Sequence, residues 1–233
     1  MQPSPNSAWG WKRSLAAALT RTSHSDREIP DARVEGLAAD LATKAGCDAL
    51  IAQLPDVDLL VNNMGIFEPK PFEDIPDEDR MRFFETNVLS GVRLSRHYVR
   101  GMRARDWRRI VFVSSESGLQ IPAEMIHYGV TKTTQLAVAR GLAETLAGTG
   151  VTVNSVLPGS TASEGVSGFV AQLAPSRGVD AATVEREFFA TARPSSLLQR
   201  FATTDEIGAM TAPRGSAMRR HRSLEACFTR ADR

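Results

Sequence analysis

Segments that favour β-strands alternate with segments that favour α-helices between about residues 31 and 208. Short apolar runs at 57–61, 110–113 and 151–156 are typical of buried strands, and residues 32–39 predict a further strand. Apolar residues at helical spacing fill 43–54, a long stretch from 76 to about 105, and 128–147. This alternation predicts an α/β domain with a parallel sheet, in which sites form where the strands end.

The two ends of the chain break this pattern. Residues 1–30 contain one helix candidate, at 11–21, and no predicted strand. Residues 160–200 predict a less regular, partly helical insertion, and hydrophobic periodicity disappears from Thr211 onward. We therefore predict one domain over residues 1–233, with a regular core at about 31–208 and atypical ends.

Composition narrows the classes of protein. Hydrophobic residues make up 42% of the chain and charged residues 24%, which is typical of a globular domain. The net charge of +1 favours neither nucleic acid nor a membrane as a partner. Cys47 and Cys227 form neither a disulfide framework nor a metal cluster, which predicts no metal and a reducing, cytoplasmic location. No apolar run reaches the ~20 residues that span a bilayer.

Four polar residues, at strand ends or in the following helices, form a candidate catalytic group. Tyr128 and Lys132 are spaced i, i+4 and therefore share one helix face. Because an ammonium favours a nearby phenolate, Lys132 is expected to lower the pKa of Tyr128. Ser115 follows the strand at 110–113 and can hydrogen-bond a substrate carbonyl or alkoxide. Asn87, within the long helix, is expected to hold a water that relays protons to Lys132.

These groups suit hydride transfer between a nicotinamide and a carbonyl carbon, with Tyr128 handling the proton. Each feature alone also has an ordinary structural explanation. A Tyr-x-x-x-Lys pair is a weak motif, Ser115 is typical of a strand-end turn, and Asn87 is a polar residue that can bond helix backbone. Their combination, in this order and at the strand ends, favours the catalytic interpretation.

Five segments resemble the short-chain dehydrogenases/reductases (the SDR family), over about residues 31–208. They are Asn62-Asn63-Met64-Gly65, Asn87-Val88, Ser114-Ser115-Glu116-Ser117-Gly118, Tyr128-Gly129-Val130-Thr131-Lys132 and Val153-Asn154-Ser155-Val156-Leu157-Pro158-Gly159. The resemblance implies a Rossmann-like, doubly wound parallel sheet that is incomplete at both chain ends.

The resemblance also implies the residues of the site and their ligand. Asn87, Ser115, Tyr128 and Lys132 match the catalytic tetrad of the family. NAD or NADP is the implied cofactor, with Asp40 at the adenine, Lys132 at the nicotinamide ribose and the backbone after Pro158-Gly159 at the carboxamide. The full set of implied cofactor-binding residues is Asp40, Asn62, Gly65, Tyr128, Lys132, Pro158, Gly159, Thr161 and Ser163.

Two elements of the family have no recognisable counterpart. The family opens with a strand and a Thr-Gly-x-x-x-Gly-x-Gly turn, which lets a helix N-terminus approach the pyrophosphate. Residues 1–39 contain only Gly10 and Gly36, and the family's last strand, with Asp-Gly-Gly, is not recognisable after Met210. We therefore expect the strand at 32–39 either to pair directly with 57–61 or to leave open edges. Weak or absent dinucleotide binding is expected, and the abrupt change of pattern suggests a reading-frame or start-site error.

Two functional hypotheses follow. The first is an oxidoreductase acting on a small-molecule ketone or secondary alcohol, and 3-oxoacyl-[acyl-carrier-protein] reduction is a common activity among similar proteins. The second is a catalytically silent remnant that does not bind the dinucleotide. Similar proteins pair the helices corresponding to 77–105 and 128–147, which implies a homodimer or homotetramer. Several residues are candidates either for an apolar substrate lid or for the core: Met125, Ile126, His127, Phe169, Phe188 and Phe189.

Overall fold

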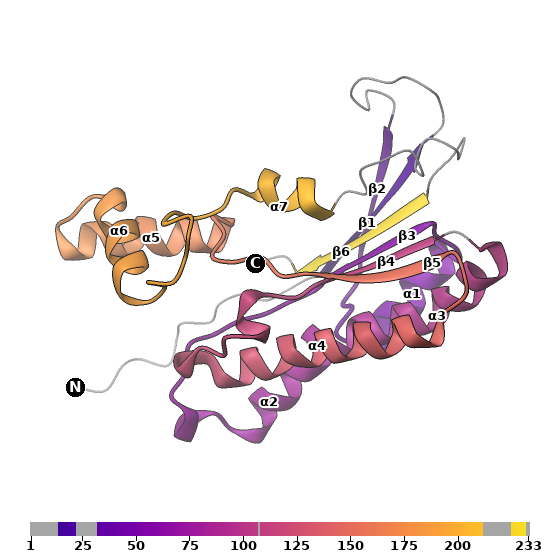
Figure 1. Ribbon diagram of the computed structural model, residues 1–233, viewed down its shortest axis with the longest axis horizontal. Helices are drawn as coiled ribbons and strands as arrows, with labels where there is room; N and C mark the ends of the chain where they lie inside the picture. The colour runs from indigo at the N-terminus through magenta and orange to yellow at the C-terminus, as the bar shows by residue number, and fades with distance from the viewer. Residues whose placement is uncertain (1–13, 22–31, 107, 212–224, 232–233) are drawn as a thin grey trace.

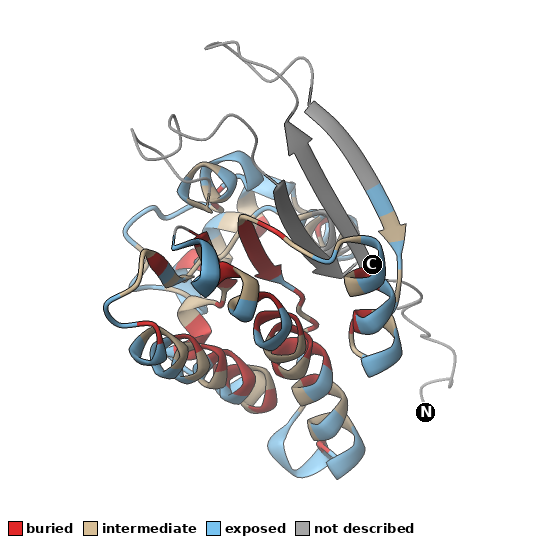
Figure 2. Ribbon diagram, turned by 90° about the vertical axis from the view of Figure 1, so that its right-hand side faces the viewer, coloured by how far each residue is buried: buried red, intermediate tan, exposed pale blue. Residues whose placement is uncertain are grey.

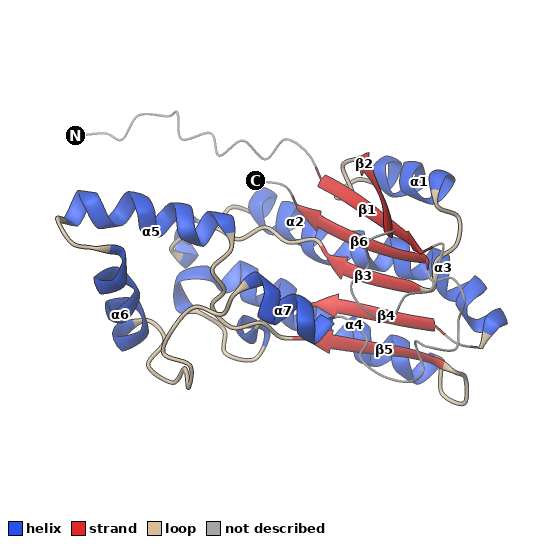
Figure 3. Ribbon diagram, turned by 90° about the horizontal axis from the view of Figure 1, so that it is seen from above, coloured by secondary structure: helices blue, strands red, loops and turns tan. Residues whose placement is uncertain are grey.

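A computed structural model of the chain describes residues 14–21, 32–106, 108–211 and 225–231 (Figure 1). The described strands form one sheet in the order β2-β1-β6-β3-β4-β5 (Figure 3). Their bounds are β1 (Ser14–Arg21), β2 (Ala32–Ala38), β3 (Leu59–Asn63), β4 (Arg108–Val113), β5 (Val151–Val156) and β6 (Glu225–Ala231). The strands predicted at 32–39, 57–61, 110–113 and 151–156 are confirmed.

Strand direction separates β1 from the rest of the sheet. β6, β3, β4 and β5 are mutually parallel along the sheet. β1 is antiparallel to both β2 and β6, so β2 runs in the same direction as β6 and β3. The predicted parallel sheet is confirmed, with its described parallel strands ending at the same edge, and β1, where no strand was predicted, is antiparallel.

The two strand positions between β2 and β3 are occupied by β1 and β6, which come from opposite ends of the chain. β6 pairs with β3, with Cys227 opposite Leu60, and β1 pairs with β6, with Ala18 opposite Cys227. We expected either direct pairing of β2 with β3 or open edges between them, and neither alternative is correct. Unpaired strand edges leave backbone N–H and C=O groups unsatisfied, and β1 and β6 supply partners for them.

The chain ends also correct two local predictions. Residues 14–21 form a strand rather than part of a helix, and a strand occurs after Thr211. Their local sequences did not indicate this, because strand formation depends more on the neighbouring strand than on intrinsic preference.

The helices agree more closely with the sequence pattern. α1 (Lys44–Gln53) begins after Thr43, whose side chain accepts the Gly46 N–H at the N-cap. The long helical stretch consists of α2 (Asp77–Phe84), a π-helical turn η2 (Glu85–Leu89) and α3 (Ser90–Arg105). The short 3₁₀ helices η3 (Glu116–Gly118) and η4 (Ala123–Met125) precede α4 (Ile126–Thr145). Single π turns within helices often mark functional sites.

The main core lies between the sheet and one layer of helices, α1, α3 and α4 (Figures 1 and 2). Leu60 and Ile110 belong to this cluster, whereas Leu59 and Val61 belong to a smaller cluster on the other face of the sheet. Successive residues of a strand point to opposite faces, so β3 is buried on both sides. Burial on both faces explains the continuous apolar runs in the sequence.

The predicted insertion forms two helices, α5 (Glu164–Arg177) and α6 (Ala181–Thr191), and α7 (Thr204–Thr211) follows it. α5 and α6 lie beyond the ends of the parallel strands, and α7 lies over the sheet face opposite α4 (Figures 1 and 3). Phe188, Phe189 and Phe201 pack together with ring centroids 5.1–5.2 Å apart. Two of the lid candidates therefore help to hold this lobe together, while the Phe169 side chain lies outside the described part.

Candidate active site

Four predicted site residues meet where β3 and β4 end. Tyr128 and Lys132 lie one turn apart on α4, and Ser115 is the N-cap residue of η3, shortly after β4. The Ser115 side chain lies close enough to the Tyr128 phenol to act on its pKa. Gly65 follows β3 and lies beside Lys132, because a Cβ atom at residue 65 would come 3.4 Å from the Lys132 Nζ.

The environment of Tyr128 raises the pKa of its phenol. Burial is the largest cause of this increase, the hydrogen bond with Ser115 acts in the opposite direction, and the Glu116 charge adds to the increase. The expected lowering of this pKa by Lys132 is wrong, since the net shift is upward. The Lys132 Nζ lies 5.6 Å from the centre of the Tyr128 ring, and the ring also packs edge-on against Phe67.

Lys132 is almost completely buried, with 4% of its surface exposed. Its Nζ donates to the Val113 carbonyl at 3.1 Å and to the Gln135 Oε1 at 3.2 Å. Burial lowers the pKa of Lys132 from 10.5 to about 7. A lysine that is only partly charged near pH 7 stabilises a phenolate less than an ordinary lysine does, in keeping with the raised pKa of Tyr128.

Asn87 lies in η2, and its side chain is engaged with backbone. The Asn87 Oδ1 accepts the Ile66 N–H at 2.8 Å, and its Nδ2 donates to the Ile66 carbonyl at 3.0 Å and to the Thr131 Oγ1 at 2.9 Å. The side chain thus ties the loop after β3 to α4. The Asn87 carbonyl, rather than its side chain, faces Lys132 by way of Gln135.

The Pro158-Gly159 segment lies beside the Ser115 loop. The Glu116 N–H donates to the Pro158 carbonyl at 2.9 Å, and the Thr161 Oγ1 donates to the Gly159 carbonyl at 2.9 Å. Ser163 is the N-cap residue of α5, and its N–H donates to the Thr161 carbonyl. The structure therefore brings this loop together with the Tyr128 group.

Asn62 and Asp40 occupy different places. Asn62 is buried at the end of β3, where its Nδ2 donates to the Ser95 Oγ at 3.1 Å and thereby links β3 to α3. Asp40 is exposed after β2, and its Oδ1 accepts the Ala42 N–H at 3.1 Å. Two strands separate β2 from β3, so Asp40 lies about 14 Å across the sheet from the β3 end.

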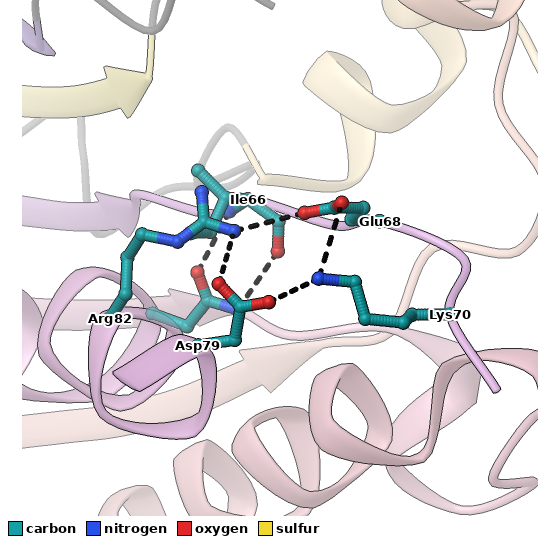
Figure 4. Close-up of polar contacts among 6 residues, drawn as sticks. Ile66, Glu68, Lys70, Asp79 and Arg82 are labelled. Carbon is teal, nitrogen blue, oxygen red and sulfur yellow. Dashed lines mark hydrogen bonds and ion pairs between the residues drawn. The ribbon is translucent and has the colours of Figure 1, made fainter. Parts of the chain in front are cut away.

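A network of ion pairs fixes the loop after β3 against α2 (Figure 4). Arg82 bonds Glu68 at 2.9 Å and Asp79 at 3.2 Å, and Lys70 bonds Asp79. Next to this network, His127 is buried with its ring 4.2 Å from the Phe83 ring, and burial lowers the pKa of His127. His127 therefore packs against α2 through Phe83.

A second link joins the α5–α6 lobe to the Ser115 loop. The Arg193 Nε donates to the Glu116 Oε1 at 3.3 Å, and the Arg193 guanidinium lies 3.6 Å from the Glu124 Oε1. Sequence reasoning missed Arg193, Glu116 and also Gln135. The i, i+3 spacing of Gln135 from Lys132 was a signal that could have identified it. No group of metal-ligating side chains occurs in the described residues, and none of the helices in that part of the chain is long and apolar enough to cross a membrane.

Comparisons with known proteins agree on one family. The family model described as short chain dehydrogenase matches residues 11–173. The uncharacterized oxidoreductase YvaG of Bacillus subtilis is 43% identical over 187 residues, which cover 80% of this chain and 69% of YvaG. The 3-oxoacyl-[acyl-carrier-protein] reductase FabG of Vibrio cholerae is 32% identical over 54% of this chain and 53% of its own length.

A solved structure shows the same fold. L-sorbose reductase from Gluconobacter frateurii, crystallised with NADPH and L-sorbose, superposes with a TM-score of 0.67 at 26% sequence identity. The match covers 75% of this chain and 67% of that one. On the family match, the relatives and the shared fold, the chain belongs to the short-chain dehydrogenase family of oxidoreductases.

Proposed function

We propose that this protein transfers hydride between NAD or NADP and a small ketone or secondary alcohol, with Tyr128 as the general acid or base. One observation carries the proposal: the Ser115 side chain acts on the Tyr128 phenol, with the buried Lys132 one turn along the same helix. A hydroxyl pair of this kind can bind a carbonyl oxygen from two sides.

The raised pKa of Tyr128 keeps its phenol in the protonated form that ketone reduction requires. A phenol that stays protonated at neutral pH can donate its proton to the oxygen of a carbonyl as that oxygen gains negative charge. Ser115 then hydrogen-bonds the same oxygen and stabilises the developing charge. After the transfer, the proton has moved from the Tyr128 oxygen to the product hydroxyl, and Tyr128 must be reprotonated.

The residues present fit the nicotinamide end of the cofactor. Gly65 leaves space beside the Lys132 Nζ that a larger residue would fill, and the Pro158-Gly159 loop lies at the same edge of the sheet. Lys132 would hold the ribose next to the nicotinamide, and the backbone after Gly159 would hold the carboxamide. When bound, the nicotinamide supplies or accepts the hydride.

The part of the site expected to hold the pyrophosphate of the cofactor supports a second candidate function. In this candidate, the protein is a family member that does not bind the dinucleotide productively. In the described residues, no helix follows β1 or β6 directly. The family's support for a pyrophosphate is a glycine turn leading from the first strand into a helix N-terminus. The described part of the chain provides no such support in these lanes.

The substrate proposal follows the named relatives. FabG of Vibrio cholerae is named for a 3-oxoacyl thioester, and the Gluconobacter frateurii structure contains a ketose. We propose a substrate of this general class, a ketone with neighbouring polar groups. An assay panel should therefore pair L-sorbose with an acetoacetyl thioester, with NADH and NADPH as alternative hydride donors.

The decisive variant is Tyr128→Phe, which keeps the ring and removes the transferable proton. We expect kcat/KM for ketone reduction to fall by about 10²–10⁴, the usual scale for a general acid. Tyr98 is the matched control, because it is the other tyrosine of the chain and its hydroxyl bonds the Leu54 carbonyl in the core. Tyr98→Phe should leave turnover nearly unchanged in the fraction of protein that is folded.

The outcomes separate the two candidates. Full activity in Tyr128→Phe would show that another group supplies the proton. Absence of both turnover and nucleotide fluorescence changes in the folded wild-type protein would favour the silent family member.

We also propose that the chain assembles as a homodimer or homotetramer through α3 and α4. The exposed face of α4 carries Val130, which is 51% exposed, and Gly141, where a Cβ would meet nothing within 4 Å. A small-residue helix face of this kind allows a second copy to approach closely. Light scattering at micromolar concentration should give at least twice the chain mass of 25.3 kDa, and a monomer would contradict the proposal.

A further inference from the structure

Gln135 is a buried polar residue that the proposed chemistry leaves without a role. It lies three residues after Lys132 on α4, on the same helix face, and only 3% of its surface is exposed. Its Nε2 donates to the Asn87 carbonyl at 2.5 Å, and its Oε1 accepts from the Lys132 Nζ at 3.2 Å. One side chain therefore connects the ammonium group to η2.

The π-helical turn explains why the Asn87 carbonyl faces α4. Within η2, the Ser90 N–H bonds the Glu85 carbonyl five residues earlier, which interrupts the regular i→i−4 pattern of an α-helix. The Asn87 carbonyl accepts the Gln135 side chain at this interruption. The turn and the glutamine thus form one connected feature.

The two hydrogen bonds require an amide in one orientation. A carbonyl can only accept, so the Asn87 oxygen must face the NH₂ group of Gln135. An ammonium can only donate, so Lys132 must face the Oε1 of Gln135. A carboxylate at this position would satisfy Lys132 alone, and an apolar side chain would satisfy neither group.

These contacts also set the direction of Lys132. An ammonium has three N–H groups, and in the described residues two of them have acceptors, the Val113 carbonyl and the Gln135 Oε1. Two fixed bonds on a tetrahedral nitrogen determine the direction of the third N–H. Gly65 keeps the space beside this nitrogen open, since a Cβ there would lie 3.4 Å away.

We propose that Gln135 is a positioning residue, whose amide links the Lys132 ammonium to the Asn87 carbonyl in the place expected for a relay water. The inference rests on the proposed function, in which Lys132 orients the ribose. An amide nitrogen does not release its proton at neutral pH, so Gln135 fixes Lys132 without passing protons to Asn87. Gln135 therefore provides a fixed side-chain link between Lys132 and Asn87 in the place of a mobile water.

The surroundings of Lys132 make the effect of Gln135 on the pKa of Lys132 measurable. The Tyr128 ring on the same helix lies 5.6 Å from the Lys132 Nζ, and Glu116 of η3 acts on Tyr128. Burial is the cause that lowers the pKa of Lys132, and no carboxylate from the described parts of β3, β4 or η2 contributes to it. Gln135 is the side chain that accepts from the Lys132 ammonium in the described residues, and mutation can remove this acceptor.

A lysine titration tests the inference without needing turnover. The chain has four lysines, so ¹³C labelling of lysine side chains gives four sets of signals, and Lys132→Arg identifies the set from Lys132. Gln135→Leu removes an acceptor and should lower the pKa of Lys132 by about one unit. Gln135→Glu adds a negative charge in the same shape and should raise it by about one unit or more. Thr134→Val, at the neighbouring position of α4, should leave it unchanged.

Superimposable titrations in wild type and both Gln135 variants would overturn the inference. Should Gln135→Leu fail to fold, Gln135→Glu alone decides, because an unchanged pKa in the charged variant would equally overturn it. In active enzyme, the decline of kcat/KM at high pH should move down in Gln135→Leu and up in Gln135→Glu. If the titrations shift and this decline does not, the positioning of Lys132 stands, and the part of Lys132 in the proposed function fails.

Discussion

The strands that carry the candidate catalytic residues differ from the two strands that fill the neighbouring lanes. β3, β4 and β5 each end in a loop that holds a site residue, namely Gly65, Ser115 and Pro158. β1 runs in the opposite direction, so its end lies at the other edge of the sheet, and the described residues end with β6. One half of the sheet therefore continues into a site, and the other provides backbone pairing.

This difference shows that a segment needs less to become a strand of the sheet than to form part of a functional site. Backbone hydrogen bonds hold a strand in place, and almost any extended segment offers them. A site needs particular side chains in particular loops. Segments from either end of the chain can thus complete the sheet beside β3 by backbone pairing.

The largest expected effect tests whether β6 lies between β1 and β3. Cys227→Pro removes a backbone N–H and should destabilise a strand paired on both sides by about 3 kcal/mol or more. Cys227→Val keeps the backbone donor and is the matched control. Urea unfolding measures both variants, and equal midpoints for them would show that β6 is not a central strand.

A second prediction concerns the buried lysine of the catalytic half. The pKa of Lys132 is about 7 in the folded protein and 10.5 ordinarily, so the unfolded chain binds more protons between these values. Stability should therefore rise with pH from 7 to 9.5, by about 3 kcal/mol from this group. Lys132→Met should lack that part of the rise in urea unfolding at each pH. Parallel stability curves for the two proteins would show that Lys132 keeps an ordinary pKa.

The prediction with the smallest expected effect concerns how much each end of the cofactor contributes to its binding affinity. If the described residues support only the nicotinamide end, NADPH should bind no more than about tenfold more tightly than reduced nicotinamide mononucleotide, or about 1.4 kcal/mol. Fluorescence titration measures both ligands, with 2′-phospho-ADP-ribose as a competitor that should displace neither. Dinucleotide binding tighter by about a thousandfold would show that another part of the chain supports the pyrophosphate.

The sequence by itself determined the regular half of the molecule. Apolar runs and helical spacing predicted β3, β4, β5, α1 and α4, because these patterns arise from local geometry and burial. The same local geometry placed Tyr128 and Lys132 on one helix face, and the turn after β4 placed Ser115 beside them. Chain order and spacing were sufficient to predict that these residues lie together.

Tertiary structure alone decided the rest. β1 and β6 pair with each other from opposite ends of the chain, so no local pattern could reveal their places in the sheet. The direction of the Tyr128 pKa shift depends on burial, which outweighs the influence that spacing suggested for Lys132. The bond between Gln135 and the Asn87 carbonyl joins residues 48 positions apart across a π-helical turn. Such features result from packing between distant segments, and spacing along one helix does not encode them.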